Sequence, residues 1–157
     1  MPASILVVDD ENAITSGLEL LLRDEGYEID VSSSVAEAQS LLARRWFDLV
    51  FLDLRLPDGD GIDLLEHIKD TAPETEVILM TAHGSIEVTI EAIKRGAFYY
   101  LEKPFSFDQV KILAERALEF KAIKTENRLG KSARRPDQED FGLVGNNPQL
   151  RQVRAIT

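Results

Sequence analysis

The sequence LVFLDLRLPDGDG, residues 49–61, is the most informative stretch of this chain for its fold. Its first four residues are apolar, and Asp53 follows them directly. Near-continuous apolar runs are typical of strands that are buried on both faces, as in a parallel sheet. The proline and glycines of residues 57–61 then indicate a turn. This stretch therefore predicts a buried parallel strand that carries a carboxylate at its carboxyl end.

Apolar runs of the same kind recur before and after this stretch. They lie at residues 5–8, 77–80 and 98–101, and a weaker, alternating run lies at residues 28–31. Between the runs, the apolar residues change to a helical spacing. Strands that alternate strictly with helices predict an α/β fold, a (βα)5 unit with a doubly wound, parallel five-stranded sheet covered by helices on both faces. In such sheets the ligand lies beyond the carboxyl ends of the strands.

Typical capping residues lie between the expected strands and helices. Ser34 and Ser85 are suited to the N-cap position of a helix. Gly26 and Gly96 are suited to the position directly after a helix ends. A last helix begins at Phe107. The capping residues therefore support the alternating order of strands and helices.

The end of the chain differs in composition from the rest. Helical sequence continues to about Arg128, whereas residues 129–140 contain the glycine, serine, proline and charged residues that are typical of a linker. Residues 141–157 are apolar-periodic again but are too few for a domain. We therefore expect one domain over residues 1–120, a helical extension and linker over residues 121–140, and the truncated start of a second domain.

The composition excludes several classes of function. The chain has 157 residues, no cysteine and a formal net charge of −10. Disulfides and thiolate metal sites are excluded, and the acidic charge argues against nucleic-acid binding through a broad basic surface. No apolar run approaches the roughly 20 residues that cross a membrane, and the first residues lead into a strand rather than a signal peptide. We therefore expect a soluble, cytoplasmic protein.

Three aspartates follow predicted strands. Asp9 and Asp10 come directly after the first strand, and Asp53 comes directly after the third. These strands can be neighbours in a doubly wound sheet, so their carboxyl ends place the three carboxylates around one crevice. Such a cluster repels itself and raises its own pKa values unless a cation compensates the charge. Mg²⁺ is the usual cation where oxygen ligands and phosphate meet, and we expect it here.

Two more predicted strands end in residues that suit a phosphoryl group. Thr81 follows the fourth strand, and Lys103 follows the fifth. Mg²⁺ and the Lys103 ammonium can neutralise a phosphoryl group on Asp53, and the Thr81 hydroxyl can donate a hydrogen bond to it. Each residue alone is ordinary, but their joint position at strand ends indicates phosphoryl chemistry.

These residues resemble the receiver domain of two-component response regulators. The matching motifs are Val8-Asp9-Asp10-Glu11, Leu52-Asp53-Leu54-Arg55-Leu56-Pro57-Asp58-Gly59-Asp60-Gly61, Met80-Thr81-Ala82 and Lys103-Pro104-Phe105. The resemblance covers roughly residues 4–120. It implies a flavodoxin-like or CheY-like arrangement of the predicted sheet and a regulatory phosphoacceptor rather than an enzyme.

The resemblance also implies the roles of individual residues in phosphorylation. Asp53 would accept a phosphoryl group from a sensor histidine kinase, and Thr81 and Lys103 would sense it. Tyr100 matches the aromatic residue whose ring turns inward when Thr81 moves. The peptide bond between Lys103 and Pro104 is expected to be cis.

For the metal, the resemblance implies a ligand set made of oxygen atoms. Asp10, Asp53 and the backbone carbonyl of Arg55 would hold Mg²⁺, and Asp9 would act through a water molecule. The expected cofactor is therefore Mg²⁺ alone.

A narrower resemblance is to the NtrC-type subfamily, whose members activate sigma-54 RNA polymerase through an AAA+ ATPase domain. Residues 81–85 and 92–98 carry it, and residues 141–148 are similar to the segment that opens that ATPase domain. Tyr99 and Thr15 depart from the subfamily pattern, which usually has aspartate and arginine there. The chain would thus comprise a receiver, a linker and the first residues of an ATPase, with assembly of the ATPase under phosphorylation control.

The last helix predicts a homodimer. Val110, Leu113, Ala117 and Phe120 have the spacing of a coiled-coil stripe, and Ile123 extends the apolar surface. Packing on the receiver's own sheet explains the first half of this stripe but not the second. We therefore expect two receivers to meet through the fourth helix, fifth strand and fifth helix, with their helical extensions paired.

Two other functions fit the same topology less well. A stand-alone phosphotransferase or phosphatase with an aspartate nucleophile usually needs a second carboxylate two residues after Asp53, where this chain has Arg55. A flavin-binding protein needs a phosphate loop after the first strand, where residues 9–11 are acidic. The Gly-Lys-Ser of residues 130–132 is no P-loop, because the required earlier glycine is replaced by Thr125.

Overall fold

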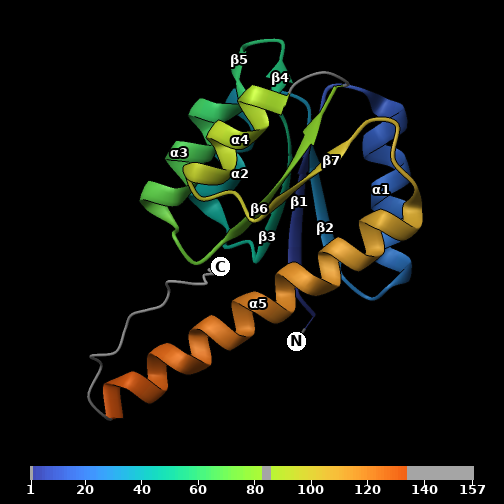
Figure 1. The fold of residues 1–157 in the computed structure, drawn as a ribbon. Helices are drawn as coiled ribbons and strands as arrows, with labels where there is room; N and C mark the ends of the chain where they lie inside the picture. Colours follow the sequence, from blue (N-terminus) through green and yellow to red (C-terminus); the bar gives the residue numbers. More distant parts are fainter. Residues whose placement is uncertain (1, 83–85, 134–157) are drawn as a thin grey trace. The chain divides into compact units, whose positions relative to one another are not determined.

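The predicted strands form one parallel sheet in the order β2-β1-β3-β6-β7, which confirms the doubly wound α/β fold (Figure 1). The strands are β1 (Ser4–Val8), β2 (Glu28–Ser32), β3 (Leu49–Asp53), β6 (Glu76–Thr81) and β7 (Tyr99–Glu102). In this order β1 and β3 are direct neighbours, with Val8 opposite Leu52. The carboxyl ends of β1 and β3 therefore lie side by side, and β6 ends next to them.

The computed structural model describes the backbone of residues 2–82 and 86–133, and side chains as far as residue 123. The chain divides into two units, Met1–Lys121 and Ala122–Thr157. The sheet and the helices that cover it belong to the first unit. In the part of the chain that is described, no helix is both long enough and apolar enough to cross a membrane.

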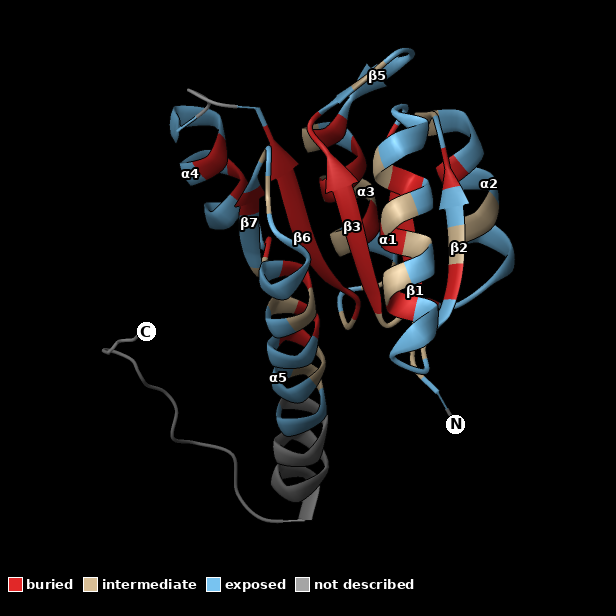
Figure 2. Ribbon diagram, turned by 90° about the vertical axis from the view of Figure 1, so that its right-hand side faces the viewer, coloured by how far each residue is buried: buried red, intermediate tan, exposed pale blue. Residues whose placement is uncertain are grey.

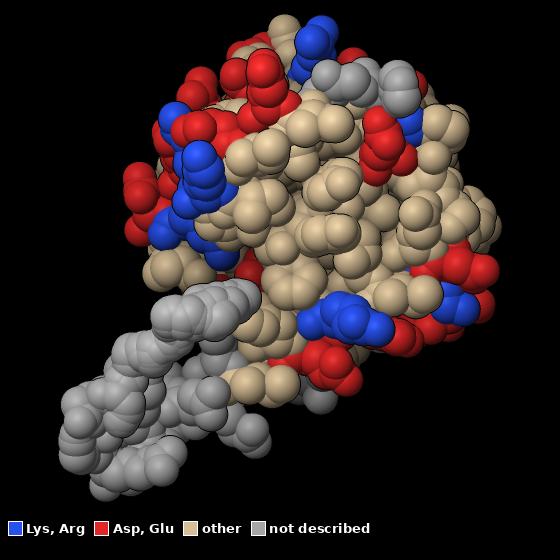
Figure 3. Space-filling view, in the orientation of Figure 1, with Lys and Arg blue, Asp and Glu red and all other residues tan. Residues whose placement is uncertain are grey.

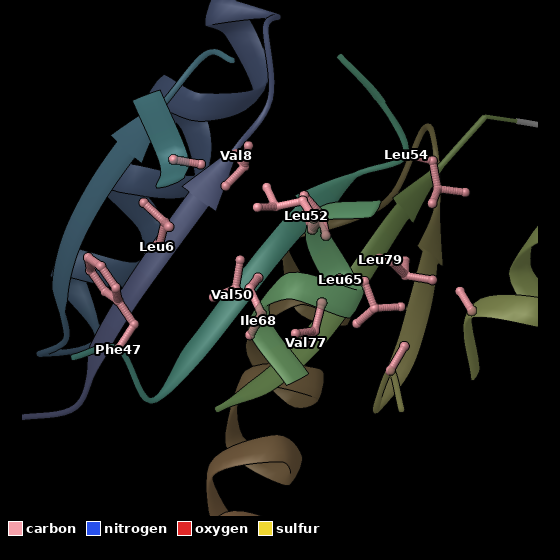
Figure 4. Close-up of a cluster of buried hydrophobic side chains, with 14 residues drawn as sticks. Leu6, Val8, Phe47, Val50, Leu52, Leu54, Leu65, Ile68, Val77 and Leu79 are labelled. Atoms are coloured by element: carbon pink, nitrogen blue, oxygen red, sulfur yellow. The ribbon is translucent and has the colours of Figure 1, made fainter. Parts of the chain in front are cut away.

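Helices cover both faces of the sheet, and each face has its own apolar core (Figures 1 and 2). The helices are α1 (Asn12–Asp24), α2 (Val35–Arg44), α3 (Gly61–Thr71), α4 (Ile86–Lys94) and α5 (Phe107–Ala133). One core joins α2, α3 and α4 to the sheet (Figure 4), and the other joins α1 and α5 to it. Because β1, β3 and β6 contribute to both cores, their sequences are almost wholly apolar.

The helix boundaries follow the expected capping chemistry. The Ser34 hydroxyl accepts a hydrogen bond from the Glu37 N–H at 3.1 Å and so caps α2. Gly26 and Gly96 have φ angles of 97° and 114°, a left-handed conformation in which glycine is favoured. Ser85, the expected cap of α4, lies outside the described residues.

The stretch after Asp53 forms a short antiparallel pair that the sequence pattern did not predict. Its strands are β4 (Arg55–Leu56) and β5 (Gly59–Asp60), and residues 57–58 form the turn. The Gly61 N–H donates to the Leu54 carbonyl at 2.8 Å and closes the base of this hairpin. Each strand has only two residues, too few for a recognisable pattern of alternation.

The last helix is longer than expected. It continues to Ala133, so the start of the expected linker at residues 129–133 is helical. The first proline after Pro104 is Pro136, and nothing earlier in the sequence forces the helix to end. The rest of the expected linker, residues 134–140, and the expected second-domain start, residues 141–157, lie outside the described residues.

Candidate functional site

Three carboxylates meet at the carboxyl ends of β1 and β3. One oxygen atom from each of Asp9, Asp10 and Asp53 lies within 4.8 Å of the others. Asp9 and Asp53 are buried, and Asp10 is exposed. The adjacency of β1 and β3 produces this cluster, because both strands run parallel and end at the same edge of the sheet. The structure thus contains the acidic crevice that the sequence predicts.

Lys103 provides the opposite charge. It follows β7 directly, and its Nζ lies 2.8 Å from Asp9 Oδ2 and 3.4 Å from Asp53 Oδ2. Its backbone N–H donates to the Thr81 carbonyl at 2.8 Å, which fixes the chain beside β6. The bond between Lys103 and Pro104 is cis, as expected. The ammonium therefore lies among the carboxylates rather than in solvent.

Glu11 is a member of this site that was not predicted from the sequence. Its Oε1 accepts from Lys103 Nζ at 2.7 Å, which is shorter than the distance from Nζ to Asp53. The Glu11 backbone N–H donates to Asp9 Oδ1 at 2.9 Å. Asp9 Oδ1 thus accepts a hydrogen bond from this N–H, and Asp9 Oδ2 forms an ion pair with Lys103. In the sequence, the only sign of this role is that Glu11, an acidic residue, directly follows the Asp9-Asp10 pair.

Burial and charge shift the titration of the central groups. Burial raises the pKa of Asp53 to about 6, and the Asp9 carboxylate adds to this effect, against the opposing effects of Lys103 and of the Arg55 N–H. Burial alone would lower the pKa of Lys103, but hydrogen bonds to Asp9 and Glu11 and the charge of Asp53 raise it above its ordinary value. Lys103 is therefore fully charged at neutral pH, whereas the charge of Asp53 is incompletely compensated.

Asp53 faces an open cavity of about 870 Å³. The residues around it include Asp10, Glu11, Arg55 and Lys103. The Arg55 backbone N–H donates to Asp53 Oδ1 at 3.3 Å, so the loop after β3 turns back onto the carboxylate. The cavity is large enough for a small anion and a cation beside the Asp53 side chain.

The two remaining candidate residues lie at different places. Thr81 is the last residue of β6 and is buried at the same edge of the sheet as the aspartates. Tyr100 instead lines a separate cavity of about 440 Å³ with Ile112 and Leu113, and it is partly exposed. Its ring centroid is 4.9 Å from that of Tyr99. His83, which the sequence places after the fourth strand, lies outside the described residues.

A largely uncharged area covers the face formed by α4, β7 and the first part of α5, with charged residues around it (Figure 3). Its exposed apolar side chains come from all three elements. They are Ile86, Ile90 and Ile93 of α4, Tyr99 and Tyr100 of β7, and Ile112 of α5. Contiguous apolar surface of this kind is typical of an interaction surface.

Comparison with known proteins gives one family for this arrangement. The protein-family model described as "response regulator receiver domain" matches residues 5–115 of this chain. The alginate biosynthesis transcriptional regulatory protein AlgB of Pseudomonas putida is 39% identical over 150 residues, which are 95% of this chain and 33% of that protein. The chain thus spans about a third of the length of the curated relatives it matches.

Two solved structures are also similar. The crystal structure of NtrX from Brucella abortus in complex with ADP has a TM-score of 0.78 and 39% identity, and the match covers 98% of this chain and 33% of that one. The solution structure of the beryllofluoride-activated NtrC4 receiver domain dimer has a TM-score of 0.72 and 40% identity, and the match covers 75% of this chain and 98% of that one.

Proposed function

Because this chain belongs to the response regulator receiver domain family, we propose that Asp53 accepts a phosphoryl group from a sensor histidine kinase of a two-component system. The observation that carries this proposal is the position of Asp53. It ends β3 and lines an open cavity, with the partly buried Lys103 ammonium 3.4 Å away and two more carboxylates beside it. A carboxylate in this position can receive a phosphoryl group whose charge the site is built to offset.

The donor set fits Mg²⁺. Hard divalent cations prefer oxygen ligands, and three carboxylates within 4.8 Å of one another retain negative charge that one ammonium cannot balance. We assign direct ligation to Asp10, Asp53 and the backbone carbonyl of Arg55. Asp9 would act through water, which agrees with the engagement of both its oxygen atoms by Glu11 and Lys103. When bound, Mg²⁺ supplies positive charge to the phosphoryl oxygens.

The residues of the chain have separate roles in the transfer. An ionised Asp53 oxygen attacks phosphorus, and the bond from phosphorus to the imidazole nitrogen of the kinase breaks with its electron pair on that nitrogen. Lys103 offsets charge on the phosphoryl oxygens, and the Thr81 hydroxyl donates a hydrogen bond to one of them. The aspartyl phosphate is the regulatory signal.

Phosphorylation would change binding at the largely uncharged face of α4, β7 and α5. The phosphoryl group carries about −1.5 to −2 charges, in place of the single charge of the Asp53 carboxylate. Movement of Thr81 toward this charge would let Tyr100 turn inward and change the surface on which it lies. We propose that a second copy of this chain binds there and that the extended α5 helices pair. The similar NtrC4 receiver domain is a dimer in its beryllofluoride-activated form, which supports this proposal.

We further propose that the chain is the receiver part of a sigma-54-dependent transcriptional activator that works in the cytoplasm. AlgB is named a transcriptional regulatory protein, and the NtrX structure was solved with ADP. Residues 141–157 would open the AAA+ ATPase domain, and phosphorylation would control its assembly. The receiver itself is regulatory.

Chemical trapping tests the phosphoacceptor directly. The chain is incubated with a small-molecule phosphodonor and Mg²⁺, the acyl phosphate is reduced with borohydride, and the modified residue is located by peptide mass spectrometry. We expect modification at Asp53 in the wild type and in Asp60→Asn, a control on the same loop, and none in Asp53→Asn. Modification of Asp53→Asn, or steady release of phosphate typical of a phosphatase, would contradict the proposal.

A further inference from the structure

A carboxylate outside the acidic cluster joins the loop after β3 to the start of α2. Asp58 lies in the turn between β4 and β5. Its Oδ1 accepts from the Val35 N–H at 2.7 Å, and its Oδ2 accepts from the Ala36 N–H at 3.0 Å. Both partners are more than 20 residues away in the sequence. One side chain therefore links two separate elements through two hydrogen bonds.

These bonds provide acceptors for the N–H groups at the N-terminus of α2. The first N–H groups of a helix have no partner within the helix and need other acceptors. The Ser34 hydroxyl accepts from the Glu37 N–H at 3.1 Å, and Asp58 accepts from the two preceding N–H groups. The same two N–H groups hold the pKa of Asp58 below its ordinary value. The helix dipole also favours an anion at this end.

The hairpin approaches α2 closely at the next residue. A Cβ atom on Gly59 would lie 3.0 Å from Val35 Cγ2, a distance that side chains rarely tolerate. Glycine thus permits the approach that Asp58 requires. The contact is a close fit between the turn and the first residue of α2.

The other end of this loop belongs to the proposed metal site. The Arg55 N–H donates to Asp53 Oδ1 at 3.3 Å, and the Arg55 carbonyl is the proposed ligand. The loop is closed at its base by the bond from the Gly61 N–H to the Leu54 carbonyl. Arg55 pairs with Asp60 across the hairpin, so its orientation depends on where the hairpin lies. Asp58 is the side chain that holds the tip.

We propose that Asp58 is a positioning residue for the metal site: by holding the β4–β5 hairpin on α2, it sets the direction of the Arg55 carbonyl and N–H toward Asp53. The proposal rests on the proposed Mg²⁺ site. Residues that orient ligands from outside the coordination sphere typically change metal affinity by about 10- to 100-fold when they are removed. Asp58 would act at the low end of this range, because it holds the loop and not the ligand atom itself.

Two control variants separate positioning from other effects. Ser34→Ala removes a cap from the same helix but leaves the link to the hairpin intact. Asp63→Asn removes one negative charge from an exposed position at the start of α3, near the same loop. Asp58→Asn and Asp58→Ala remove the same charge, but asparagine keeps one acceptor oxygen. At equal charge, the difference between the last two therefore reports what the remaining acceptor oxygen and the longer side chain contribute.

The test is a titration of the full chain with Mg²⁺, followed by amide NMR, with thermal unfolding of each variant measured in parallel. We expect Asp58→Ala to weaken Mg²⁺ binding by about tenfold and Asp58→Asn to weaken it less. The Arg55 amide signal should shift in both before metal is added. Ser34→Ala should lower the melting temperature but bind Mg²⁺ like the wild type, and Asp63→Asn should also bind like the wild type.

Wild-type affinity in Asp58→Ala, or an equal loss in Ser34→Ala or Asp63→Asn, would overturn the positioning role and leave the metal site standing. Failure of the wild type itself to bind Mg²⁺ would overturn the metal site and, with it, this role.

Discussion

The Asp53 carboxylate carries its charge in an unfavourable environment. Burial and Asp9 both disfavour the charged form, and Lys103 lies closer to Asp9 and Glu11 than to Asp53. A cation at this position would relieve that imbalance, whereas a phosphoryl group would add negative charge and increase the need for a cation. The metal-free site is therefore expected to destabilise the fold at neutral pH.

Asp53→Asn tests this expectation. The folded-state pKa of Asp53, about 6, lies above its ordinary value of 3.8. The stabilising contribution of the group is therefore complete below about pH 4 and is lost as the pH rises through about 6. In EDTA at pH 7.5 we expect Asp53→Asn to raise the free energy of unfolding by on the order of 2 kcal/mol. Urea unfolding should show this gain shrinking toward pH 4. A gain that is independent of pH, or a loss, would refute the unfavourable charge on Asp53.

The two neighbouring aspartates should differ in their effect on Mg²⁺. Asp10 is exposed to the cavity and is assigned direct ligation, whereas Asp9 is engaged by Glu11 and Lys103. We expect Asp9→Asn to weaken Mg²⁺ binding by roughly tenfold, as for a residue outside the coordination sphere, and Asp10→Asn to weaken it more. Amide NMR titrations give both affinities. The opposite ranking would refute the division of roles.

The role of Glu11 could not be predicted from the sequence. Strand ends could be located from apolar runs, so residues directly after them could be brought together. Glu11 lies one residue further, on the way into α1, and its side chain reaches Lys103 only because of the path of that loop. Such a contact depends on the loop conformation, which no periodic pattern encodes.

At the scale of secondary-structure elements, the chain after β3 lies very close to Gly61, the first residue of α3. A Cβ atom on Gly61 would lie 2.8 Å from the Leu54 Cα, and the Asp53 carbonyl is also in its path. We expect Gly61→Ala to lower the free energy of unfolding by about 1–3 kcal/mol, the usual cost of overpacking. Urea unfolding of this variant is the measurement.

Gly17→Ala is the matched control for this prediction. Gly17 lies inside α1, and its nearest neighbour atom would be 3.5 Å from the added Cβ, which is ordinary contact. Alanine is a better helix former than glycine by about 1 kcal/mol, so this variant should be neutral or more stable. Equal losses in both variants would be inconsistent with the close approach at Gly61.

The elements themselves differ in how well the sequence predicts them. The three central strands, β1, β3 and β6, can be recognised because burial on both faces makes them continuously apolar. The edge strands β2 and β7 are partly exposed, and β2 shows only an alternating pattern. The β4–β5 hairpin could not be recognised, because its position depends on Asp58 and on a tertiary contact with α2. The end of α5 lies beyond the predicted one, because the glycine, lysine and serine of residues 129–133 are typical of a linker but no proline interrupts the helix there.

In the protein as a whole, we propose that the signal leaves through the largely uncharged face of α4, β7 and α5. Ile112 is exposed on this face and lines the same cavity as Tyr100. We expect Ile112→Asp to weaken the phosphorylated dimer by about tenfold or more, since it would bury an unpaired charge. Leu20→Asp, at an exposed position on α1, is the control and should dimerise like the wild type. Sedimentation equilibrium gives the dimer dissociation constants of both variants. Equal weakening by Ile112→Asp and Leu20→Asp would show that this face is not the dimer interface.

Control of assembly by the state of Asp53 can be measured by sedimentation velocity with Mg²⁺ and beryllofluoride, a phosphoryl mimic. Wild-type protein at micromolar concentration is compared with Asp53→Asn, with and without the mimic. We expect the sedimentation coefficient of the wild type to rise to that of a dimer when the mimic and Mg²⁺ are both present, and Asp53→Asn to show no response. An unchanged wild type, or the same increase in Asp53→Asn, would show that Asp53 does not control assembly.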